Sequence, residues 1–339
     1  MNVDPAPPVV LLCTGQIRSL MTCAQQAVVN LKSGIRITER DYFYDNEYDE
    51  VHNEEGVYKT KAAATADIIM LANAIGGPRI ALGFISASTG SFFFGDLTVK
   101  WHGRNGVNLN HPTARSLMER GMFITDLWIR RDYGLTDVLL ENNSPVTTII
   151  AVEDEHTYLR VCRLAARKGW IVVYMKGCPD VSTRALLLYL QDRFQVPVGA
   201  VVDLDTGGLI SLRTIMDNGP RSRVAVAEEK YKLPYVRWYG PLPSHTHPLL
   251  PLGYGLRSRT MTNEYYARVE ELVKDGQSFV SDPVPLGSGF HLATRTEERL
   301  RELALPKETK ATINTSGLTH QKSDSQFEEA MDYMIVNWV

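Results

Sequence analysis

The sequence lacks the features that mark membrane, secreted and zinc-binding proteins. No segment approaches the ~18 consecutive apolar residues of a membrane-spanning helix, and residues 1–8 carry no basic cluster of a signal or transit peptide. The four cysteines form no Cys-x-x-Cys pair, which is typical of a reducing compartment and predicts no zinc ribbon. His245 and His247 lie in a proline-rich loop without further ligands nearby, so we expect no zinc there.

The chain also lacks a strong charge of either sign. Its formal net charge is −3, which argues against a protein that coats DNA non-specifically, because such binding depends on phosphate neutralisation. Cations outnumber acids between Lys100 and Arg131, but taken alone this stretch is typical of an ordinary solvated surface. The length of 339 residues and the 44% hydrophobic content predict two domains with substantial cores.

The N-terminal part of the chain has the pattern of a winged helix. Apolar residues recur at helical spacing over 16–32, and an alanine-rich helix is predicted from Thr60 to Ile75. Two strands follow, Ile80 to Ala87 and Phe92 to Val99, with Thr89-Gly90 as the turn. Helices followed by a β-ribbon are a common way to lay a helix in a groove of duplex DNA. A small α+β domain without a nucleic-acid role is the open alternative.

From about residue 145 strands and helices alternate. This alternation predicts right-handed βαβ units and a parallel sheet, which is an α/β fold. We therefore expect a winged-helix domain at 1–140 and a parallel α/β domain with a C-terminal extension at 141–339. The extension holds a polar connection, 306–326, before a final helix, 327–338. The alternating elements are expected at Val146 to Val152, Glu155 to Arg167, Trp170 to Tyr174, Val181 to Phe194, Val198 to Val202 and Thr206 to Met216, with further strands at Val224 to Ala227 and Tyr235 to Trp238.

Three carboxylates lie at the predicted carboxyl ends of parallel strands, where α/β domains place their functional groups. Glu153 ends one strand, whereas Asp203 and Asp205 end another, with Gly207-Gly208 just beyond. Both side chains of an extended Asp-x-Asp share one face, and such hard oxygen ligands suit Mg²⁺ with water and phosphate. Asp205 has a plainer interpretation as the N-cap of the helix that begins at Thr206. The independent Glu153 favours the metal site.

Seven short segments carry a resemblance to known proteins. They are Thr38-Glu39-Arg40-Asp41-Tyr42-Phe43-Tyr44, Gly77-Pro78-Arg79, Gly95-Asp96-Leu97, Ala151-Val152-Glu153-Asp154-Glu155, Lys176-Gly177-Cys178-Pro179-Asp180-Val181-Ser182-Thr183-Arg184, Asp203-Leu204-Asp205 with Gly208, and Trp238-Tyr239-Gly240. The Glu plus Asp-x-Asp set resembles the Toprim domain of topoisomerases, primases and some nucleases. In this order, from about residue 16 to 240, the segments resemble the A subunit of topoisomerase VI and its eukaryotic relative, the transesterase that starts meiotic recombination.

The resemblance implies a site and a reaction. Tyr44, the last tyrosine of its segment, would be the nucleophile, with Tyr42 as the fallback, and Arg40 would stabilise the developing phenolate and the phosphate. Attack would leave a 5′-phosphotyrosyl link and a free 3′ hydroxyl, and two protomers would make a double-strand break. The residues implied to hold Mg²⁺ are Glu153, Asp203 and Asp205, and those implied to contact DNA are Arg79, Lys176 and Arg184, with a structural role as the open alternative for Arg184.

The implied partners are double-stranded DNA, a second protomer and a topoisomerase VI B-like ATPase-type subunit, and the implied location is the nucleus. ATP use would need that separate subunit, because the chain has no Gly-x-x-x-x-Gly-Lys phosphate loop. The alternatives are an ATP-dependent topoisomerase VI A subunit, an inactive DNA-bridging paralogue and a Toprim nuclease that uses metal-activated water. Thr206-Gly207 and Thr89 depart from the family pattern and mark a divergent member.

Overall fold

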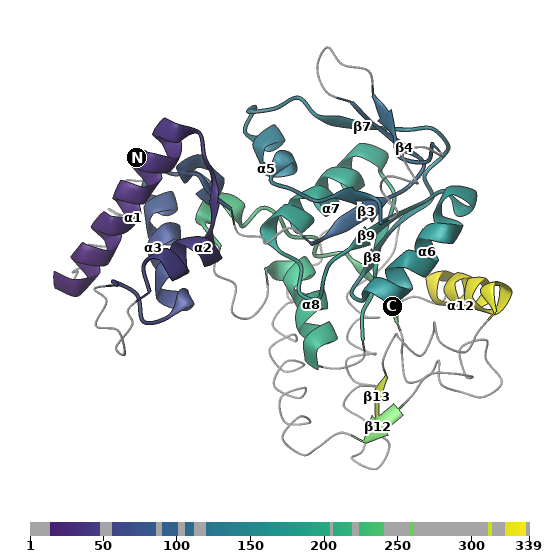
Figure 1. Cartoon of the computed structure of the whole chain (residues 1–339). Coiled ribbons are helices and arrows are strands. Elements are labelled where there is room, and N and C mark those ends of the chain that lie inside the picture. The colour runs from purple at the N-terminus through teal and green to yellow at the C-terminus, as the bar shows by residue number, and fades with distance from the viewer. Residues whose placement is uncertain are drawn as a thin grey trace, which may run out of the picture. The chain divides into compact units, whose positions relative to one another are not determined.

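The structure is a computed structural model of the chain. The chain divides into two compact units, Met1–Ser88 with Arg223–Lys230, and Thr89–Ser222 with Tyr231–Val339. Residues 89–140, which were expected in the N-terminal domain, thus contribute to the second unit. The structure describes residues 14–47, 56–85, 90–100, 106–111, 120–203, 206–218, 224–240, 258–260, 311–313 and 323–336 (Figure 1).

The N-terminal unit is built on helices. The two predicted helices are confirmed as α1 (Thr14–Ser33) and α3 (Lys61–Ala74), and the short α2 (Glu39–Asp45) lies between them in the sequence. Thr38 begins α2, because its hydroxyl accepts a hydrogen bond from the Asp41 amide at 2.9 Å. Burial of side chains from all three helices forms the core, which includes Cys23, Ala27, Tyr42, Phe43, Tyr58, Ala64, Ile68, Ala72, Leu82 and Phe84.

The predicted wing hairpin does not form in the described residues. The first expected strand is mostly a 3-10 helix, η1 (Arg79–Leu82), followed by β2 (Phe84–Ile85), which pairs in parallel with β1 (Ile37–Thr38). The second expected strand splits into β3 (Phe92–Phe94) and β4 (Leu97–Lys100), and both belong to sheets of the second unit. The long-range pairing of β3, whose three phenylalanines are all buried, has overridden the local hairpin signal.

The second unit contains the predicted parallel sheet, which is confirmed. Its strands are ordered β11-β10-β8-β9-β3-β6, and the first four are mutually parallel, whereas β3 and β6 (Met122–Phe123) are antiparallel. Every residue of β8 is buried, as expected for a central strand that is covered on both faces. The parallel strands are β8 (Thr148–Val152), β9 (Trp170–Tyr174), β10 (Val198–Val201) and β11 (Arg237–Gly240).

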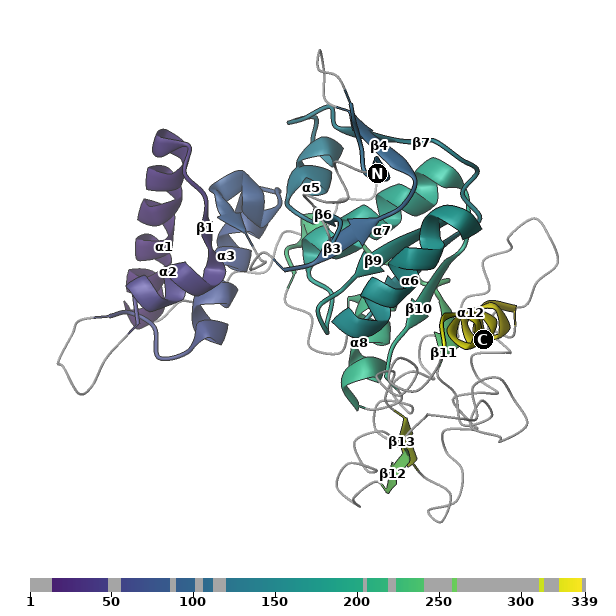
Figure 2. The ribbon, with the colours of Figure 1, turned by 45° about the vertical axis from the view of Figure 1, so that its right-hand side comes forward.

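Helices cover both faces of this sheet. α6 (Glu155–Lys168) and α7 (Val181–Phe194) lie on opposite faces of the parallel strands (Figure 1, Figure 2). Both begin at an aspartate cap: the side chain of Asp154 accepts from the Thr157 amide at 3.0 Å, and that of Asp180 accepts from the Thr183 amide at 2.7 Å. α8 (Thr206–Asp217) follows β10 and completes the alternation that the sequence predicts.

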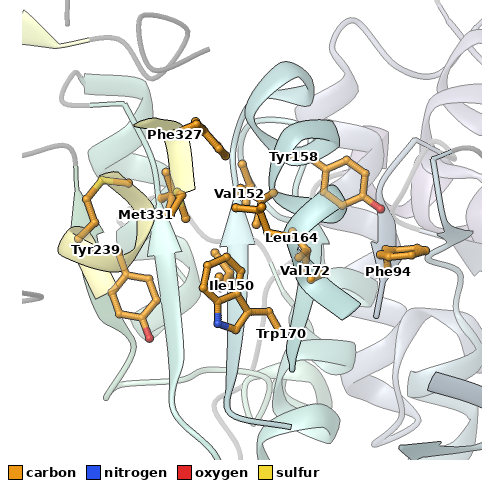
Figure 3. Packing of buried hydrophobic residues seen from close by; sticks show 14 of the residues in the cluster. Phe94, Ile150, Val152, Tyr158, Leu164, Trp170, Val172, Tyr239, Phe327 and Met331 are labelled. Atoms are coloured by element: carbon orange, nitrogen blue, oxygen red, sulfur yellow. The ribbon is translucent and has the colours of Figure 1, made fainter. Parts of the chain in front are cut away.

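The C-terminal helix α12 (Asp324–Val336) is part of the same core. Figure 3 shows Phe327 and Met331 gathered with side chains of α6 around Ile150 and Val152 of β8. Ion pairs also join α12 to α6, among them Lys168 Nζ to Asp332 Oδ2 at 2.7 Å. The predicted final helix is thus confirmed, with an earlier start. Most of the predicted polar connection lies outside the described residues, but 311–313 form β13 (Ala311–Ile313), paired with β12 (Ser258–Thr260).

The remaining described elements extend the second unit. A three-stranded antiparallel sheet, β5-β4-β7, joins β4 to β5 (Val107–Asn108) and β7 (Leu139–Asn142), and α5 (Leu127–Asp132) precedes β7. The strand expected at 224–227 is instead a 3-10 helix, η2 (Val226–Glu228), in the N-terminal unit. None of the helices in the described part of the chain is long and apolar enough to cross a membrane.

Candidate functional site

Two of the three predicted acidic ligands meet at one edge of the parallel sheet. β8 and β10 pair in register, with Val152 opposite Val201, so the residues that follow these strands emerge side by side. Glu153 Oε2 accepts a hydrogen bond of 2.9 Å from the backbone amide of Asp203. The Glu153 carboxylate therefore reaches the backbone of Asp203, and both residues lie at the same edge of the sheet. Asp205, the third predicted ligand, lies outside the described residues.

The start of α8 braces this edge. Ser211 Oγ donates to Glu153 Oε1 at 3.3 Å, so both oxygens of the glutamate have protein donors. Gly208 allows the close approach of α8, because a Cβ at this position would lie 2.0 Å from the carbonyl oxygen of Asp203. Any larger side chain would force the strand end and the helix apart. Gly208, which the sequence singled out beside the acidic motif, is therefore required by packing.

The tyrosine segment places its aromatic residues on different sides of α2. Tyr42 and Phe43 are buried, whereas Tyr44 is 56% exposed. Arg40 lies one helical turn earlier, and its guanidinium carbon is 5.5 Å from the centre of the Tyr44 ring, within the range of a cation–π contact. An arginine and a solvent-accessible phenol thus share one face of the helix. The roles of Tyr44 as nucleophile and of Arg40 as the cation that assists it stay predictions.

Tyr42, the fallback nucleophile, is held inside the core. Its hydroxyl lies 3.0 Å from the Tyr58 hydroxyl, which in turn donates towards Asp67 Oδ2 or the Ser19 carbonyl, each at 3.0 Å. Burial raises the pKa of Tyr42 well above its usual range, and the hydrogen bond to Tyr58 offsets this only in part. Tyr42 can therefore not present a phenolate to a substrate in this structure, which leaves Tyr44 as the accessible hydroxyl of α2.

Comparison with known proteins identifies the second unit. Residues 148–305 match the model of a protein family described as the Toprim domain of the topoisomerase 6 A-subunit/Spo11 type. The chain carries a Toprim domain of this type. The match confirms the family resemblance for the motifs within these residues, which include the segments of Glu153 and Asp203, whereas the tyrosine segment, 38–44, lies outside the matched residues.

Curated proteins that are similar to this chain are named as SPO11 proteins or as a topoisomerase 6 A subunit. The chain is 39% identical over 99 residues to "Meiotic recombination protein SPO11" of Mus musculus, an alignment that covers 28% of this chain and 24% of the relative. It is 31% identical over 121 residues to "Meiotic recombination protein SPO11-1" of Arabidopsis thaliana, covering 33% of each. It is 32% identical over 98 residues to the A subunit of DNA topoisomerase 6 from Arabidopsis thaliana, covering 28% of this chain and 22% of the relative. The chain thus matches a third or less of the length of each of these relatives.

The acidic edge of this Toprim domain has the donor chemistry that Mg²⁺ prefers. Glu153 and Asp203 offer carboxylate oxygens, and Mg²⁺ is commonly held by one or two carboxylates together with water and substrate phosphate. Within the described ranges, no group of three or more His, Cys, Asp or Glu is arranged to hold a metal. The predicted ligand set of Glu153, Asp203 and Asp205 stays a prediction, and Asp205 lies outside the described residues.

Two residues that the sequence assigned to DNA contact lie in the segment 176–184, one exposed and one buried. Lys176 is exposed and has a left-handed φ of 55°, so its contact with DNA stays a prediction. Arg184 is 2% exposed, and its Nη1 donates to the carbonyl of Tyr231 at 3.1 Å. The expectation that Arg184 contacts DNA is therefore corrected to a structural role, because its guanidinium ties α7 to the segment before β11.

Arg79 requires the same correction. Its side chain is 4% exposed, and its Nε donates to both carboxylate oxygens of Glu228, at 3.2 and 2.9 Å. Its Nη1 also pairs with Glu39, the first residue of α2. Sequence reasoning missed these two glutamates. Glu39 lies in the tyrosine segment but was given no role there, and Arg79 and Glu228 are 149 positions apart, so no local pattern could have joined them.

Proposed function

We propose that this protein forms double-strand breaks in duplex DNA by Mg²⁺-dependent tyrosine transesterification, in the nucleus, at the start of meiotic recombination. The observation that carries the proposal is the presentation of Tyr44 at the surface of α2, beside Arg40, in a chain whose Toprim domain brings Glu153 and Asp203 together. The names of the SPO11 relatives support the meiotic role.

The proposed reaction exchanges one phosphoester for another. The Tyr44 hydroxyl attacks a backbone phosphorus, a tyrosyl–phosphate bond forms, and the bond from phosphorus to the 3′ oxygen breaks. The phenolic proton ends on the departing 3′ hydroxyl, so no ATP is consumed. The usual pKa of a tyrosine, near 10, makes it a weak nucleophile at neutral pH, and Arg40 would stabilise the developing phenolate. Mg²⁺ at Glu153 and Asp203 would neutralise charge on the phosphate and on the leaving oxygen.

The two halves of the proposed site belong to different protomers. Following the resemblance, Tyr44 of one protomer works with the acidic edge of another, so that two protomers cut both strands. The proposed partners are thus double-stranded DNA, a second copy of the chain and a topoisomerase VI B-like ATPase-type subunit. Lys176 is the proposed DNA contact on the Toprim domain, because its side chain is exposed near the acidic edge: the Gly177 amide that follows it donates to the Glu153 carbonyl at 3.2 Å.

A second candidate function is that of the A subunit in an ATP-dependent topoisomerase VI. The alignment with the A subunit of the Arabidopsis topoisomerase 6 favours it. The two functions share the cleavage step and differ in the fate of the cleaved DNA. A topoisomerase would relax supercoiled plasmid when ATP and an ATPase partner are added, whereas a break-forming transesterase would leave broken DNA attached to protein.

A covalent-adduct assay tests the proposal. The full chain is incubated with supercoiled plasmid and Mg²⁺, the reaction is stopped with denaturant, and DNA-linked peptides are mapped by mass spectrometry. We expect a 5′-linked adduct on Tyr44, lost in EDTA. Cleavage without a covalent link would favour a nuclease that uses activated water. DNA binding without cleavage, also in the presence of an ATPase partner, would favour an inactive bridging paralogue.

A further inference from the structure

A buried charge cluster includes the first residue of α2, the helix that carries Tyr44. It consists of Glu39, Arg79 and Glu228, which are 5%, 4% and 2% exposed. The Arg79 guanidinium contacts both glutamates, with Nη2 2.8 Å from Glu228 Oε2 and Nη1 paired with Glu39. The three residues come from three separate elements, α2, η1 and η2. One side chain thus joins the start of α2 to two distant parts of the chain.

The surplus negative charge of the cluster is met by neutral donors. The backbone amide of Arg79 donates to Glu228 Oε1 at 3.0 Å, and the amide of Ala225 donates to Glu228 Oε2 at 3.3 Å. The Thr65 hydroxyl donates to Glu39 Oε2 at 3.0 Å. Burial by itself lowers the pKa of Arg79, but the charges of Glu39 and Glu228 outweigh this and raise it, so the guanidinium stays protonated.

A buried ion cluster of this kind is weak evidence for stability. Replacing buried ion pairs by apolar residues of similar volume is often neutral or stabilising, whereas removing one partner leaves an uncompensated charge. Such a cluster does supply a defined geometry, since the planar guanidinium donates its hydrogen bonds only in fixed directions. The functional question is therefore which element the cluster orients.

That element is α2. A seven-residue helix is too short to be stable by itself, so tertiary contacts decide its position. Glu39 is its first residue and lies five positions before Tyr44. Glu228 belongs to the stretch 224–230, which is inserted in sequence between α8 and β11 of the Toprim unit but belongs to the N-terminal unit. The backbone amide of Val226 donates to Asn73 Oδ1 of α3 at 2.8 Å, which gives this stretch a further contact within the N-terminal unit.

We infer that Arg79 is a positioning residue for the Tyr44 nucleophile. Through its contacts with Glu39 and Glu228, Arg79 holds α2 against the stretch 224–230. The inference deepens the proposed function and rests on it for the role of Tyr44. The stretch 224–230 lies between α8 and β11 in the sequence but belongs to the N-terminal unit, so all three charges that fix α2 come from that unit.

Two variants and one control test the inference on the full chain. Glu228→Gln keeps the size of the side chain and removes its charge, and Arg79→Lys keeps the charge but not the fork that joins two carboxylates. Ile68→Val opens a one-methylene cavity in the same unit and serves as the control, because Ile68 is fully buried on α3 and has no part in the cluster. Each protein is compared by melting temperature, by hydrogen exchange of α2 and α3, and by covalent-adduct formation on supercoiled plasmid with Mg²⁺.

Positioning and plain stability predict different patterns. If Arg79 positions α2, Glu228→Gln and Arg79→Lys should speed amide exchange in α2 more than in α3. They should also slow adduct formation by roughly 10- to 100-fold while DNA binding is unchanged. Ile68→Val should lower the melting temperature without lowering the adduct rate. Of the two charge variants, Glu228→Gln should be the milder, because its amide oxygen can still accept from Arg79.

Unchanged exchange of α2 in both charge variants would overturn the inference, whatever the enzyme activity. So would adduct rates that fall in step with melting temperature across all three variants, the control included. A wild-type chain that forms no adduct, alone or with an ATPase partner, would instead refute the proposed function. Faster amide exchange confined to α2 in that case would still establish that Arg79 positions this helix, so the two failures can be told apart.

Discussion

Replacing Tyr44 by phenylalanine removes one oxygen from a side chain that is 56% exposed. Within the described residues, the Tyr44 hydroxyl makes no hydrogen bond, and the ring contacts with Phe43 and Arg40 do not involve it. The free energy of unfolding should therefore change by no more than about 0.5 kcal/mol, as for most surface substitutions. Covalent attachment to DNA should vanish completely, because phenylalanine has no nucleophilic atom. Binding of Mg²⁺ and DNA should both be retained.

Tyr42→Phe is the matched control, two residues away in the same helix. It removes a buried hydrogen bond to the Tyr58 hydroxyl, which should lower the free energy of unfolding by about 1 kcal/mol. Adduct formation should persist at temperatures where the variant is folded. The two substitutions thus predict opposite results: one abolishes activity without a loss of stability, and the other lowers stability without abolishing activity.

The assay is denaturing electrophoresis of labelled duplex DNA with and without protease, alongside chemical denaturation of each variant. Mixing Tyr44→Phe with Glu153→Ala protomers should restore single-strand nicks if the site is shared, since one hybrid site stays intact. Double-strand breaks made by Tyr44→Phe alone would refute the assignment of the nucleophile. If Tyr42→Phe kept them as well, the transesterase mechanism would have to be abandoned.

Three further predictions concern the Toprim unit. Glu153→Ala should abolish cleavage while circular dichroism stays unchanged, and cleavage by the wild type that persists in EDTA would rule out the Mg²⁺ role. Lys176→Ala should weaken DNA binding equally across sequences and reduce the salt dependence by about one contact, and an unaltered salt slope would exclude Lys176 from the interface. Hydrogen bonds to Lys168 lower the pKa of Glu328, so the contribution of this pair to α12 docking is present above the usual glutamate pKa and is lost as the pH falls through the lowered value. Glu328→Gln should reduce this acid-side loosening of α12, measured by hydrogen exchange as a function of pH, and leave the part that depends on the other ion pairs of α12, such as Lys168 with Asp332.

The elements of the second unit are determined largely by local sequence. Short, mostly apolar stretches such as Thr148–Val152 are typical of buried central strands, and the aspartates before α6 and α7 start their helices where the periodicity begins. Because parallel strands end at the same edge, the meeting of Glu153 and Asp203 followed from the order of strands and helices alone. The Toprim resemblance rested on the Glu plus Asp-x-Asp motif at these strand ends.

Other features depended on pairing between distant residues, which periodicity does not encode. The local pattern of 80–99 predicted a hairpin, yet the buried strand β3 pairs with β9 and not with the segment that precedes it in the sequence. Tyr42 and Tyr44 are identical in type, and only the packing of α2 buries one and exposes the other. Arg79 and Arg184 resemble DNA-binding cations in sequence, but tertiary structure encloses both, and Arg79 finds its partner Glu228 at 149 positions' distance. Local sequence determined the main helices and the parallel strands, because helix and strand periodicity are short-range, whereas the fold alone decided how 80–99 pairs and which charges and hydroxyls reach solvent.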